Sequence, residues 1–426
     1  MVKIVLVGAG SSVFGYNSVL DAANIPVLRG SELMLHDIDE TRLKTMSGLA
    51  ERINQETEAD LIIHHTIDPE EALSEADFVL VAIEVDRMNR WRLDWEIPFK
   101  HCIKQVIGEN GGPGGLFHTW RNIPPILEIA FTMEELCPDA WLLNYTNPVP
   151  RLCMAIDRYT DIKTVGLCHE VEHQLQRIAP LMNIPTAIID AVSVGLNHFS
   201  WYKELRLKDG TDAYPMLDEA LKKAKGFQPL CKAMYRQFGL YPSTDDNHMG
   251  EYLAYSWEVT PDAVRGLKWI NRCEEEGNQN WERTNRLITG KESLDVKGKL
   301  SGERAMHIIA GMMSNSNHME LQVNLPNIGQ VSNLIKDSIV ETPAIINKGG
   351  IHPIQVGEMP EGLAALCNIQ IMIQSLVVEA GVSGDMEKAK QALLVDPVVN
   401  DHDKAIAAFD ELMNTHSDLL PQFEID

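Results

Sequence analysis

Two residues of types that bind transition metals, a cysteine and a histidine, stand 30 positions apart near the middle of this chain. Cys168 begins the segment Cys-His-Glu-Val, directly after the apolar run 164–167, and His198 lies in Gly-Leu-Asn-His-Phe. A soft thiolate and an imidazole suit a divalent transition metal as a pair of ligands. A second interpretation stays open, in which Cys168 is a small buried hydrophobe and His198 is a core histidine.

The N-terminus carries a pattern that is typical of nucleotide binding. The short β-branched run 3–7 stops at Gly8 and predicts a buried strand that enters a glycine turn. No glycine stands three residues after Gly10, so the strict G-x-G-x-x-G fingerprint is broken. Gly8 still permits a tight turn, and Gly10 still lets a pyrophosphate approach the backbone at a helix N-terminus. We predict that Gly8, Gly10 and Ser11 bind a dinucleotide cofactor, although such a turn can also be purely structural.

The second predicted strand, residues 33–37, ends in an acid. Asp37 stands 27 residues after Gly10, where a carboxylate would accept hydrogen bonds from the ribose hydroxyls. A carboxylate there would repel the 2′-phosphate of NADP. The sequence therefore favours NAD as the cofactor.

Two further polar segments are ambiguous. The loop Gly-Glu-Asn-Gly-Gly-Pro-Gly-Gly at 108–115 is either a flexible turn or a loop that passes close to cofactor and substrate. In the second case Glu109 and Asn110 would supply polar contacts. The segment Asp-Asp-Asn-His at 245–248, followed by Glu251, predicts by itself a turn and a helix N-cap rather than a catalytic group.

The elements of the first half predict an open parallel sheet. Short apolar strands alternate with helical patterns, which indicates βαβ units, and ligands bind such sheets at the carboxyl ends of the strands. One long helix is predicted with an interruption near its two adjacent prolines. The predicted strands are 3–7, 33–37, 61–65, 78–83, 140–143 and 164–167, and the predicted helices are 13–24, 40–57 and 117–136.

The second half is less regular, and we predict an α+β domain. No repeat, low-complexity tract or linker separates it from the first half, so two packed domains are expected. We predict residues 1–195 as a Rossmann-like, NAD-binding domain and residues 196–426 as a second domain, which is expected to supply substrate and metal contacts. Predicted helices cover 214–238, 247–258, 360–381, 385–394 and 402–415, a charged helix or loop covers 274–299, and 319–345 alternate like strands.

Charge and cysteine content restrict the class of protein. With 37 basic and 61 acidic residues among 426, the net charge is −24, which disfavours binding to nucleic acid and to anionic membranes. Seven scattered cysteines without a C-x-x-C pair indicate reduced thiols and a cytoplasmic protein. The N-terminal apolar run is too short for a signal peptide, and we predict no membrane span.

Taken together, these motifs resemble glycoside hydrolase family 4, the NAD- and metal-dependent glycosidases. Each motif alone is weak, but eight occur in the family's order over nearly the whole chain. The resemblance implies a lactate/malate dehydrogenase-like fold and a homodimer or homotetramer. The matching segments are Gly8–Ser11, Ala76–Val79, Gly112–Gly115, Asn144–Pro148, Cys168–Val171, Gly195–Phe199, Asp246–His248 and Val323–Asn327.

The resemblance also implies a mechanism. NAD would take a hydride from C3 of the sugar, and the resulting ketone would acidify the C2 proton. A divalent metal, usually manganese, would stabilise the enediolate as a Lewis acid while a base removes that proton and the C1 substituent leaves. Water then adds and the hydride returns, so the net reaction is hydrolysis. The family is thus an exception to hydrolysis by two carboxylates.

Roles follow from the resemblance residue by residue. Cys168 and His198 would be the metal ligands, and Asp246 would be the base that removes the C2 proton. His169 stands where the leaving group is protonated, a role that suits histidine. The remaining implied assignments are cofactor contacts by Glu109 and Asn144 and sugar contacts by Asn110, Asn147 and Asn324.

The residues after Cys168 also indicate the substrate. Cys-His-Glu-Val is similar to the α-glucosidase pattern, which α-galacturonidases share, whereas 6-phosphoglycosidases have Cys-Asp or Cys-Asn. The resemblance thus implies a non-phosphorylated α-glucoside or α-uronide. Two departures keep other sugars open, including a sulfonated hexose: Glu109-Asn110 replaces an Asp-Thr type pair, and Asp245 adds a second acid beside the proposed base.

Two other functions remain as alternatives. An NAD-dependent 2-hydroxyacid dehydrogenase of the malate or lactate type would consume NAD and need no metal, but the chain lacks a clear Arg/Asp-His constellation of that kind. A nucleotide-sensing protein would bind NAD without catalysis.

Overall fold

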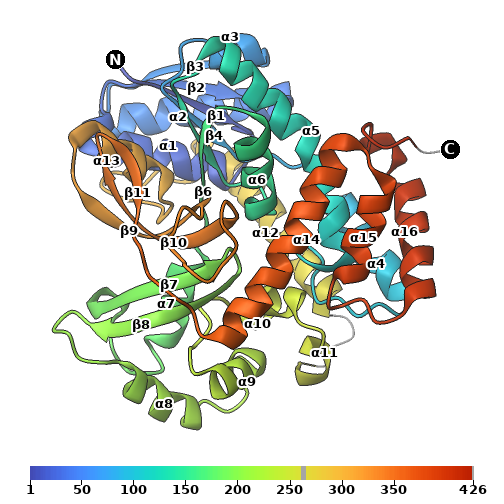
Figure 1. Ribbon diagram of the computed structural model, residues 1–426. Coiled ribbons are helices and arrows are strands. Elements are labelled where there is room, and N and C mark those ends of the chain that lie inside the picture. The colour runs from blue at the N-terminus through green and yellow to red at the C-terminus, as the bar shows by residue number, and fades with distance from the viewer. Residues whose placement is uncertain (261–264, 425–426) are drawn as a thin grey trace.

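A parallel sheet forms the first half of the molecule, as the alternation of strands and helices predicts. The computed structural model describes residues 1–260 and 265–424. Six strands pair in the order β3-β2-β1-β4-β5-β6, which is the order of doubly wound dinucleotide-binding sheets (Figure 1). The strands are β1 (Lys3–Val7), β2 (Glu32–His36), β3 (Ile62–Thr66), β4 (Phe78–Val81), β5 (Trp141–Asn144) and β6 (Lys163–Gly166).

Helices cover both faces of this sheet, which is why its central strands are apolar throughout. In β1, Ile4 and Leu6 pack on one face while Val5 and Val7 pack on the other. The first face is covered by α1 (Phe14–Asn24), α2 (Glu40–Thr57) and α13 (Ala305–Ser314). The other is covered by α3 (Pro69–Leu73), α5 (Gly112–Leu136), α6 (Val149–Tyr159) and α14 (Glu361–Ser383).

The predicted interruption near Pro124-Pro125 is wrong. Helix α5 continues through both prolines and begins five residues earlier than predicted, at Gly112. A proline removes one backbone donor and normally weakens a helix interior. Here α5 is buried on all sides from Gly112 to Ile123 and on one side beyond the prolines, so tertiary packing outweighs the local penalty.

The sheet continues into the second half through antiparallel strands. It runs on in the order β9-β10-β7-β8, with β11 paired to β10. The alternation predicted over 319–345 is confirmed as two strands. The predicted division after residue 195 falls within a hairpin whose two strands both belong to this sheet. The strands are β7 (Ile189–Leu196), β8 (Phe199–Leu207), β9 (His318–Pro326), β10 (Ile339–Asn347) and β11 (Gly350–Pro353).

One row of paired residues crosses the sheet from the nucleotide turn to the β7–β8 hairpin. Each residue of this row pairs with the next one on the neighbouring strand. The residues that follow β1, β5 and β6 therefore lie at the same side of the sheet as the β7–β8 turn. Gly8, Asn147 and Cys168 come within one to three residues of the row. The row is His36, Val7, Val81, Asn144, Gly166, Asn324, Glu341 and Gly195.

The predicted helix 214–238 is two helices. Gly226 has φ 77°, and Gln228, which precedes Pro229, has φ 38°, so the chain leaves the helical region before the second helix begins. The predicted helix 247–258 is likewise broken into short turns. The helices here are α7 (Glu170–Ile178), α8 (Tyr214–Lys223), α9 (Pro229–Phe238), α10 (Asp246–Met249) and α11 (Ser256–Val259).

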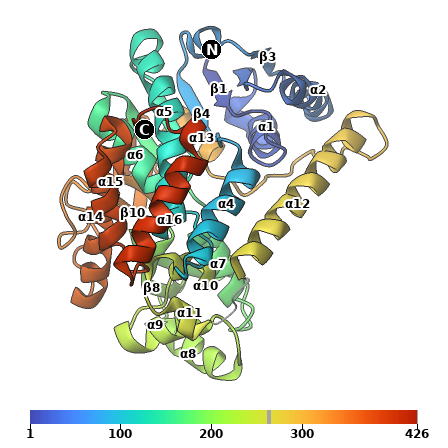
Figure 2. The same ribbon diagram turned by 90° about the vertical axis from the view of Figure 1, so that its right-hand side faces the viewer.

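The charged segment 274–299 is helical only to residue 288. It belongs to α12 (Arg265–Ile288), a long helix that runs from α4 (Arg87–Lys100) to α2 along the outside of the molecule (Figure 2). Its far end is held where the Arg42 guanidinium lies 5.3 Å from the centre of the Trp281 ring.

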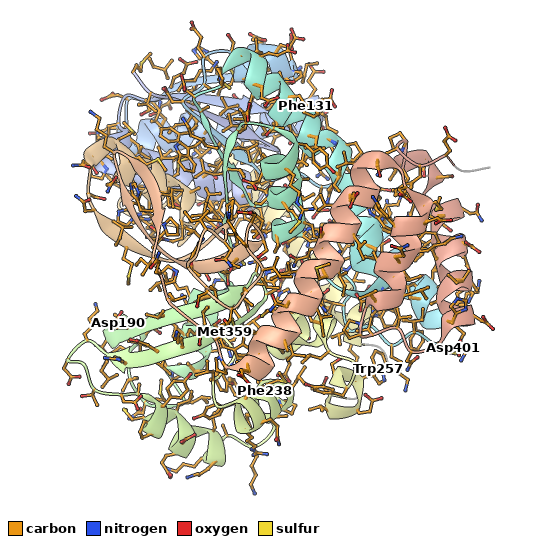
Figure 3. All side chains as sticks on the ribbon, in the orientation of Figure 1. Phe131, Asp190, Phe238, Trp257, Met359 and Asp401 are labelled. Carbon is orange, nitrogen blue, oxygen red and sulfur yellow. The ribbon has the colours of Figure 1, made fainter. Side chains whose placement is uncertain are left out.

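Three C-terminal helices, predicted over 360–381, 385–394 and 402–415, are confirmed. They are α14, α15 (Met386–Val395) and α16 (His402–Thr415), and they pack beside α4 and α5 (Figure 1). The start of α14 lies on the end of α9, where Gly362 leaves room for the Phe238 ring (Figure 3). Among the described helices α14 alone is long and apolar enough to span a membrane; 56% of its most apolar window is buried inside the protein, and core helices pass the same test.

Candidate active site

The two predicted metal ligands lie close together, Cys168 just after the carboxyl end of β6 and His198 in the β7–β8 turn. The Cys168 Sγ atom lies 3.2 Å from His198 Nε2. His198 occupies the two-residue turn between β7 and β8 with φ 61°, a strained conformation for a residue with a side chain. The strand ladder on both sides and the ring of His248, stacked 4.0 Å away, hold it there. Backbone strain of this kind is found at functional sites, where a side chain is held in one orientation.

Both groups are neutral in these surroundings. Burial raises the pKa of the Cys168 thiol, and the nearby carboxylate of Glu341 raises it further. Burial lowers the pKa of His198 well below its ordinary value, and the neighbouring ring of His248 adds to the effect. A neutral imidazole is the form that binds a metal, and a bound cation would favour the thiolate.

The pair fits a single small divalent cation. Ligands that share one zinc ion lie about this far apart, because metal–nitrogen and metal–sulfur bonds are ~2.1 and ~2.3 Å long. Within residues 1–260 and 265–424, no group of three His, Cys, Asp or Glu side chains is arranged to hold a metal. The two ligands would therefore leave coordination positions open, as catalytic rather than structural sites do.

The glycine-dense loop is fixed beside this centre by a carboxylate that the sequence did not single out as functional. Glu251, in the short turn after α10, accepts from the backbone N–H groups of Glu109 and Asn110, both at 2.7 Å, and of Gly111 at 3.3 Å. A Cβ atom on Gly111 would lie 2.3 Å from the Glu251 backbone oxygen. His248 Nδ1 lies 3.5 Å from the same carboxylate and connects the loop to His198.

Two of the predicted contact residues meet on the other side of this loop. The Glu109 carboxylate accepts from Arg87 at 2.7 Å and from Asn147 Nδ2 at 3.4 Å. Asn110 is buried, donates to Glu251 at 3.1 Å, and no described residue donates to its Oδ1 atom. The structure thus brings Glu109, Asn110 and Asn147 together, in a line of contacts that reaches Cys168 through His248.

Glu341 is a second important carboxylate that sequence reasoning missed. Only 1% of its surface is exposed, and it accepts from Asn197 at 2.8 Å, Asn324 at 3.2 Å and Ser200 at 3.1 Å. Burial raises its pKa to about 7. The one available signal was an isolated acid inside the apolar strand 339–346.

The nucleotide turn has the geometry that its glycines predict. Gly8 has φ 87°, and a Cβ atom there would lie 2.2 Å from the Ala82 backbone oxygen. The Gly10 N–H donates to Asp37 at 2.8 Å. Gly15 approaches the Ala9 backbone so closely that a Cβ atom would lie 2.1 Å from its oxygen. Gly15 thus provides the close helix–turn packing of the third fingerprint glycine, which explains the altered spacing.

Three of the predicted residues hydrogen-bond to nearby backbone groups. Ser11 accepts from the Phe14 N–H at 3.1 Å and holds the start of α1. Asn144 makes two 3.0 Å hydrogen bonds with the backbone of Thr146 and holds the turn after β5. The Asp246 carboxylate accepts from the N–H groups at the start of α9, at 2.9 and 3.2 Å. The N–H groups at a helix start have no carbonyl partner within their own helix, so a nearby carboxylate accepts hydrogen bonds from them.

The rest of the segment 245–248 behaves as its composition predicts. Asp245 accepts from the Asn247 N–H at 2.8 Å and caps α10, so the predicted turn and N-cap are confirmed. His169 is 37% exposed and lies 3.5 Å from Glu303. Burial alone would lower the pKa of His169, but the hydrogen bond and charge of Glu303 raise it above the ordinary value.

Comparison with known proteins places this α/β chain among the glycoside hydrolases. The model described as family 4 glycosyl hydrolase matches residues 3–184, and the model of that family's C-terminal domain matches residues 193–399. The chain belongs to glycosyl hydrolase family 4, as the order of its motifs predicts, and this assignment favours a glycosidase over the dehydrogenase and sensor alternatives.

Similar proteins act on more than one sugar. The chain is 35% identical to an α-glucosidase of Erwinia rhapontici, over 93% of this chain and 94% of that one. It is 33% identical to an α-galactosidase of Bacillus subtilis (strain 168) over the full length of both. A 6-phospho-α-glucosidase from gut microorganisms, solved in complex with NAD and Mn²⁺, has the same fold, with a TM-score of 0.85 at 21% identity over 99% of this chain and 100% of that one.

Proposed function

We propose that this glycosidase hydrolyses a non-phosphorylated α-glycoside, either an α-glucoside or an α-uronide, by oxidation, elimination and water addition. The observation that carries the proposal is the 3.2 Å contact between Cys168 and His198, at one end of the row that begins beside the nucleotide turn. The segment Cys-His-Glu-Val and the similarity to an α-glucosidase support the choice of glycone.

The proposal includes two cofactors. NAD would supply an acceptor, and later a donor, for the hydride of one sugar carbon. A divalent cation such as Mn²⁺, held by Cys168 and His198, would supply Lewis acidity toward the sugar oxygens. Asp37, bonded to the Gly10 N–H, leaves a carboxylate where NADP would place its 2′-phosphate, which supports NAD.

The protein's own groups would hold and move the protons. His169 keeps its proton to higher pH than an ordinary histidine and is partly exposed, which suits protonation of the leaving group. Asp246 is the proposed base at C2. Its side chain would have to turn away from the start of α9 to reach the sugar. Glu109, Asn110 and Asn147, held together by the loop, are the proposed contacts to cofactor and sugar, and Asn324 is a further sugar contact.

We also propose a division of labour along the chain. Residues 1–195 would bind the nucleotide, whereas residues 196–426 would supply His198, further sugar contacts and the contacts between subunits of a homodimer or homotetramer. Ile369 and Met372, on the outer face of α14, are 42% and 51% exposed and would suit such a contact. The seven free cysteines support a cytoplasmic location.

The test is hydrolysis of aryl α-glucoside, α-galactoside, α-glucuronide, α-galacturonide and α-glucoside 6-phosphate. NAD and Mn²⁺ are each present or withheld under reducing conditions, and Cys168→Ser is the matched control. We expect one unphosphorylated glucoside or uronide to be cleaved only when both cofactors are present. Cleavage without NAD would overturn the redox mechanism, and preference for the 6-phosphate would overturn the proposed glycone.

A further inference from the structure

Glu341 connects two strands that flank the proposed metal centre. Its Oε2 atom accepts from Asn197 Nδ2 at 2.8 Å and from Asn324 Nδ2 at 3.2 Å, while Oε1 accepts from Ser200 Oγ at 3.1 Å. Asn197 belongs to the β7–β8 turn and Asn324 to β9, so a single carboxylate on β10 holds side chains from both neighbours. All of these residues are buried.

This carboxylate fixes which way each amide faces. The Nδ2 groups of Asn197 and Asn324 donate to the same Oε2 atom of Glu341, so the NH₂ end of each amide points toward Glu341. The carbonyl end must then point away from it. No described residue donates to Asn197 Oδ1 or Asn324 Oδ1, although both atoms are buried. Glu341 therefore presents two oriented acceptors that have no partner of their own.

The two acceptors lie next to the metal centre. Asn197 directly precedes His198, whose Nε2 atom lies 3.2 Å from the Cys168 sulfur. Asn324 is the register partner of Gly166, two residues before Cys168. Sugar hydroxyls are hydrogen-bond donors and match a pair of fixed carbonyl oxygens.

We propose that Glu341 is a positioning residue of the active site. It orients Asn197 and Asn324 so that their carbonyl oxygens receive hydroxyl groups of the bound sugar, and through Asn197 it holds the turn that carries His198. Glu341 itself touches neither sugar nor metal. The inference rests on the proposed function for the identity of the sugar, but its effect on the metal centre stands independently of that function.

Three variants separate orientation from charge and from general destabilisation. Glu341→Gln can place its oxygen where Oε2 was and donate to Ser200 Oγ, which also bonds Ser243, so both amides keep their orientation. Glu341→Leu has similar size but no acceptor, so both amides are released. Glu320→Gln is the matched control, because Glu320 is a buried carboxylate on β9 that pairs with Arg304 and His318 instead.

Each variant is measured in three ways. Co²⁺ alone is titrated into the protein, and the near-ultraviolet absorption of the sulfur–cobalt bond reports the affinity of the Cys168 centre. KM and kcat are measured with the glycoside that the substrate panel identifies, and thermal unfolding reports the fold. We expect Glu341→Leu to raise KM and weaken Co²⁺ binding by roughly ten-fold or more. Glu341→Gln should stay close to wild type, and Glu320→Gln should alter only the unfolding temperature.

Two results would overturn the proposal. One is a folded Glu341→Leu protein with the KM and Co²⁺ affinity of wild type. The other is equal damage in Glu341→Gln and Glu341→Leu, since charge rather than orientation would then be what the centre needs. If Glu341→Leu does not fold, Asn324→Leu replaces it: a raised KM with unchanged Co²⁺ binding supports the proposal, and an unchanged KM overturns it. If no glycoside is cleaved, the proposed function fails while the Co²⁺ titration still decides the role of Glu341.

Discussion

The two ends of the row across the sheet are built differently. At the nucleotide turn the polar groups bond one another within the first 40 residues: Gly8 N–H to His36 O at 3.0 Å, and Gly10 N–H to Asp37 at 2.8 Å. At the Cys168–His198 centre the groups come from four separate strands or turns, and the His198 Nδ1 and Asn324 Oδ1 atoms have no partner among the described residues. The polar groups of the turn are thus paired with one another, whereas two buried polar atoms of the centre are left without a partner among the described residues.

This difference indicates which buried polar atoms a ligand could hydrogen-bond. A buried polar atom without a hydrogen bond costs about 1–3 kcal/mol, so a ligand that forms a hydrogen bond with such an atom would recover this free energy. Among the unpaired atoms near the centre are those of His198 and of asparagines whose NH₂ ends are held by Glu251 or Glu341. The comparison therefore predicts that substitutions can impair the Cys168–His198 centre without weakening NAD binding at the turn, and the reverse.

The largest effect is expected at the centre itself. Cys168→Ser and His198→Ala each remove one of two proposed metal ligands, so kcat should fall by roughly 100-fold or more. NAD affinity, measured by fluorescence titration, should remain that of wild type, because the turn makes its own hydrogen bonds. Loss of NAD binding in either variant would show that the two ends are not independent.

Glu251→Gln tests the link between the two ends. One amide oxygen can still accept from the three backbone N–H groups, but the new NH₂ group would face Asn110 Nδ2 and His248. Asn110 must then reverse its amide, so KM should rise by roughly 10- to 100-fold with the fold intact. Steady-state kinetics and thermal unfolding measure both quantities, and an unchanged KM would exclude Asn110 from sugar binding.

Gly10→Ala should break only the nucleotide end. A Cβ atom there would lie 2.7 Å from the Asp37 carboxylate, which must move away from the Gly10 N–H. NAD should then bind roughly ten-fold more weakly, about 1.4 kcal/mol. Co²⁺ binding at Cys168 should not change. Gly48→Ala in α2 is the matched control, because nothing lies within 4 Å of its Cβ position and alanine favours a helix. An equal loss of NAD affinity in both variants would argue against the predicted role of the turn.

Asp21, outside both regions, should affect stability without affecting activity. Burial raises its pKa to about 6 from 3.8, although Ser301 donates to it. The folded state therefore binds the proton more tightly than the unfolded state, and this contribution to stability is present below about pH 4 and lost as pH rises through 6. Asp21→Asn removes the dependence, so its free energy of unfolding relative to wild type should rise by up to about 3 kcal/mol between pH 4 and 7. Urea unfolding at both pH values checks this, and parallel pH profiles would contradict it.

The parallel part of the fold was predictable because its signals are local. Each buried strand is a short apolar run, and Gly8 and Cys168 follow such runs directly. The break in α5 was predicted wrongly because packing, which the sequence does not display, holds the helix through Pro124-Pro125.

The groups that complete the site were beyond local patterns. Glu251 contacts Asn110 across 141 residues, and Glu341 contacts Asn197 across 144. The motif of Asp246 predicts a base, and its carboxylate accepts hydrogen bonds from the start of α9, a partner that only the folded chain supplies. The sequence singled out Cys168 and His198, whose Sγ and Nε2 atoms the structure places 3.2 Å apart. Glu251 and Glu341, which accept hydrogen bonds from neighbouring asparagines, reach this place only when strands from both halves pair.

The central claim is that hydrolysis proceeds by elimination, with loss of the C2 proton and of the C1 substituent. It is tested most directly by running the reaction in D₂O and examining the released sugar by NMR and mass spectrometry at low conversion. The free sugar incubated with enzyme, NAD and Mn²⁺ is the control for later exchange. We expect one deuterium at C2 of the product, because the protein removes that proton before the glycosidic bond breaks and solvent replaces it. Cleavage with the original hydrogen fully retained at C2 would contradict the mechanism.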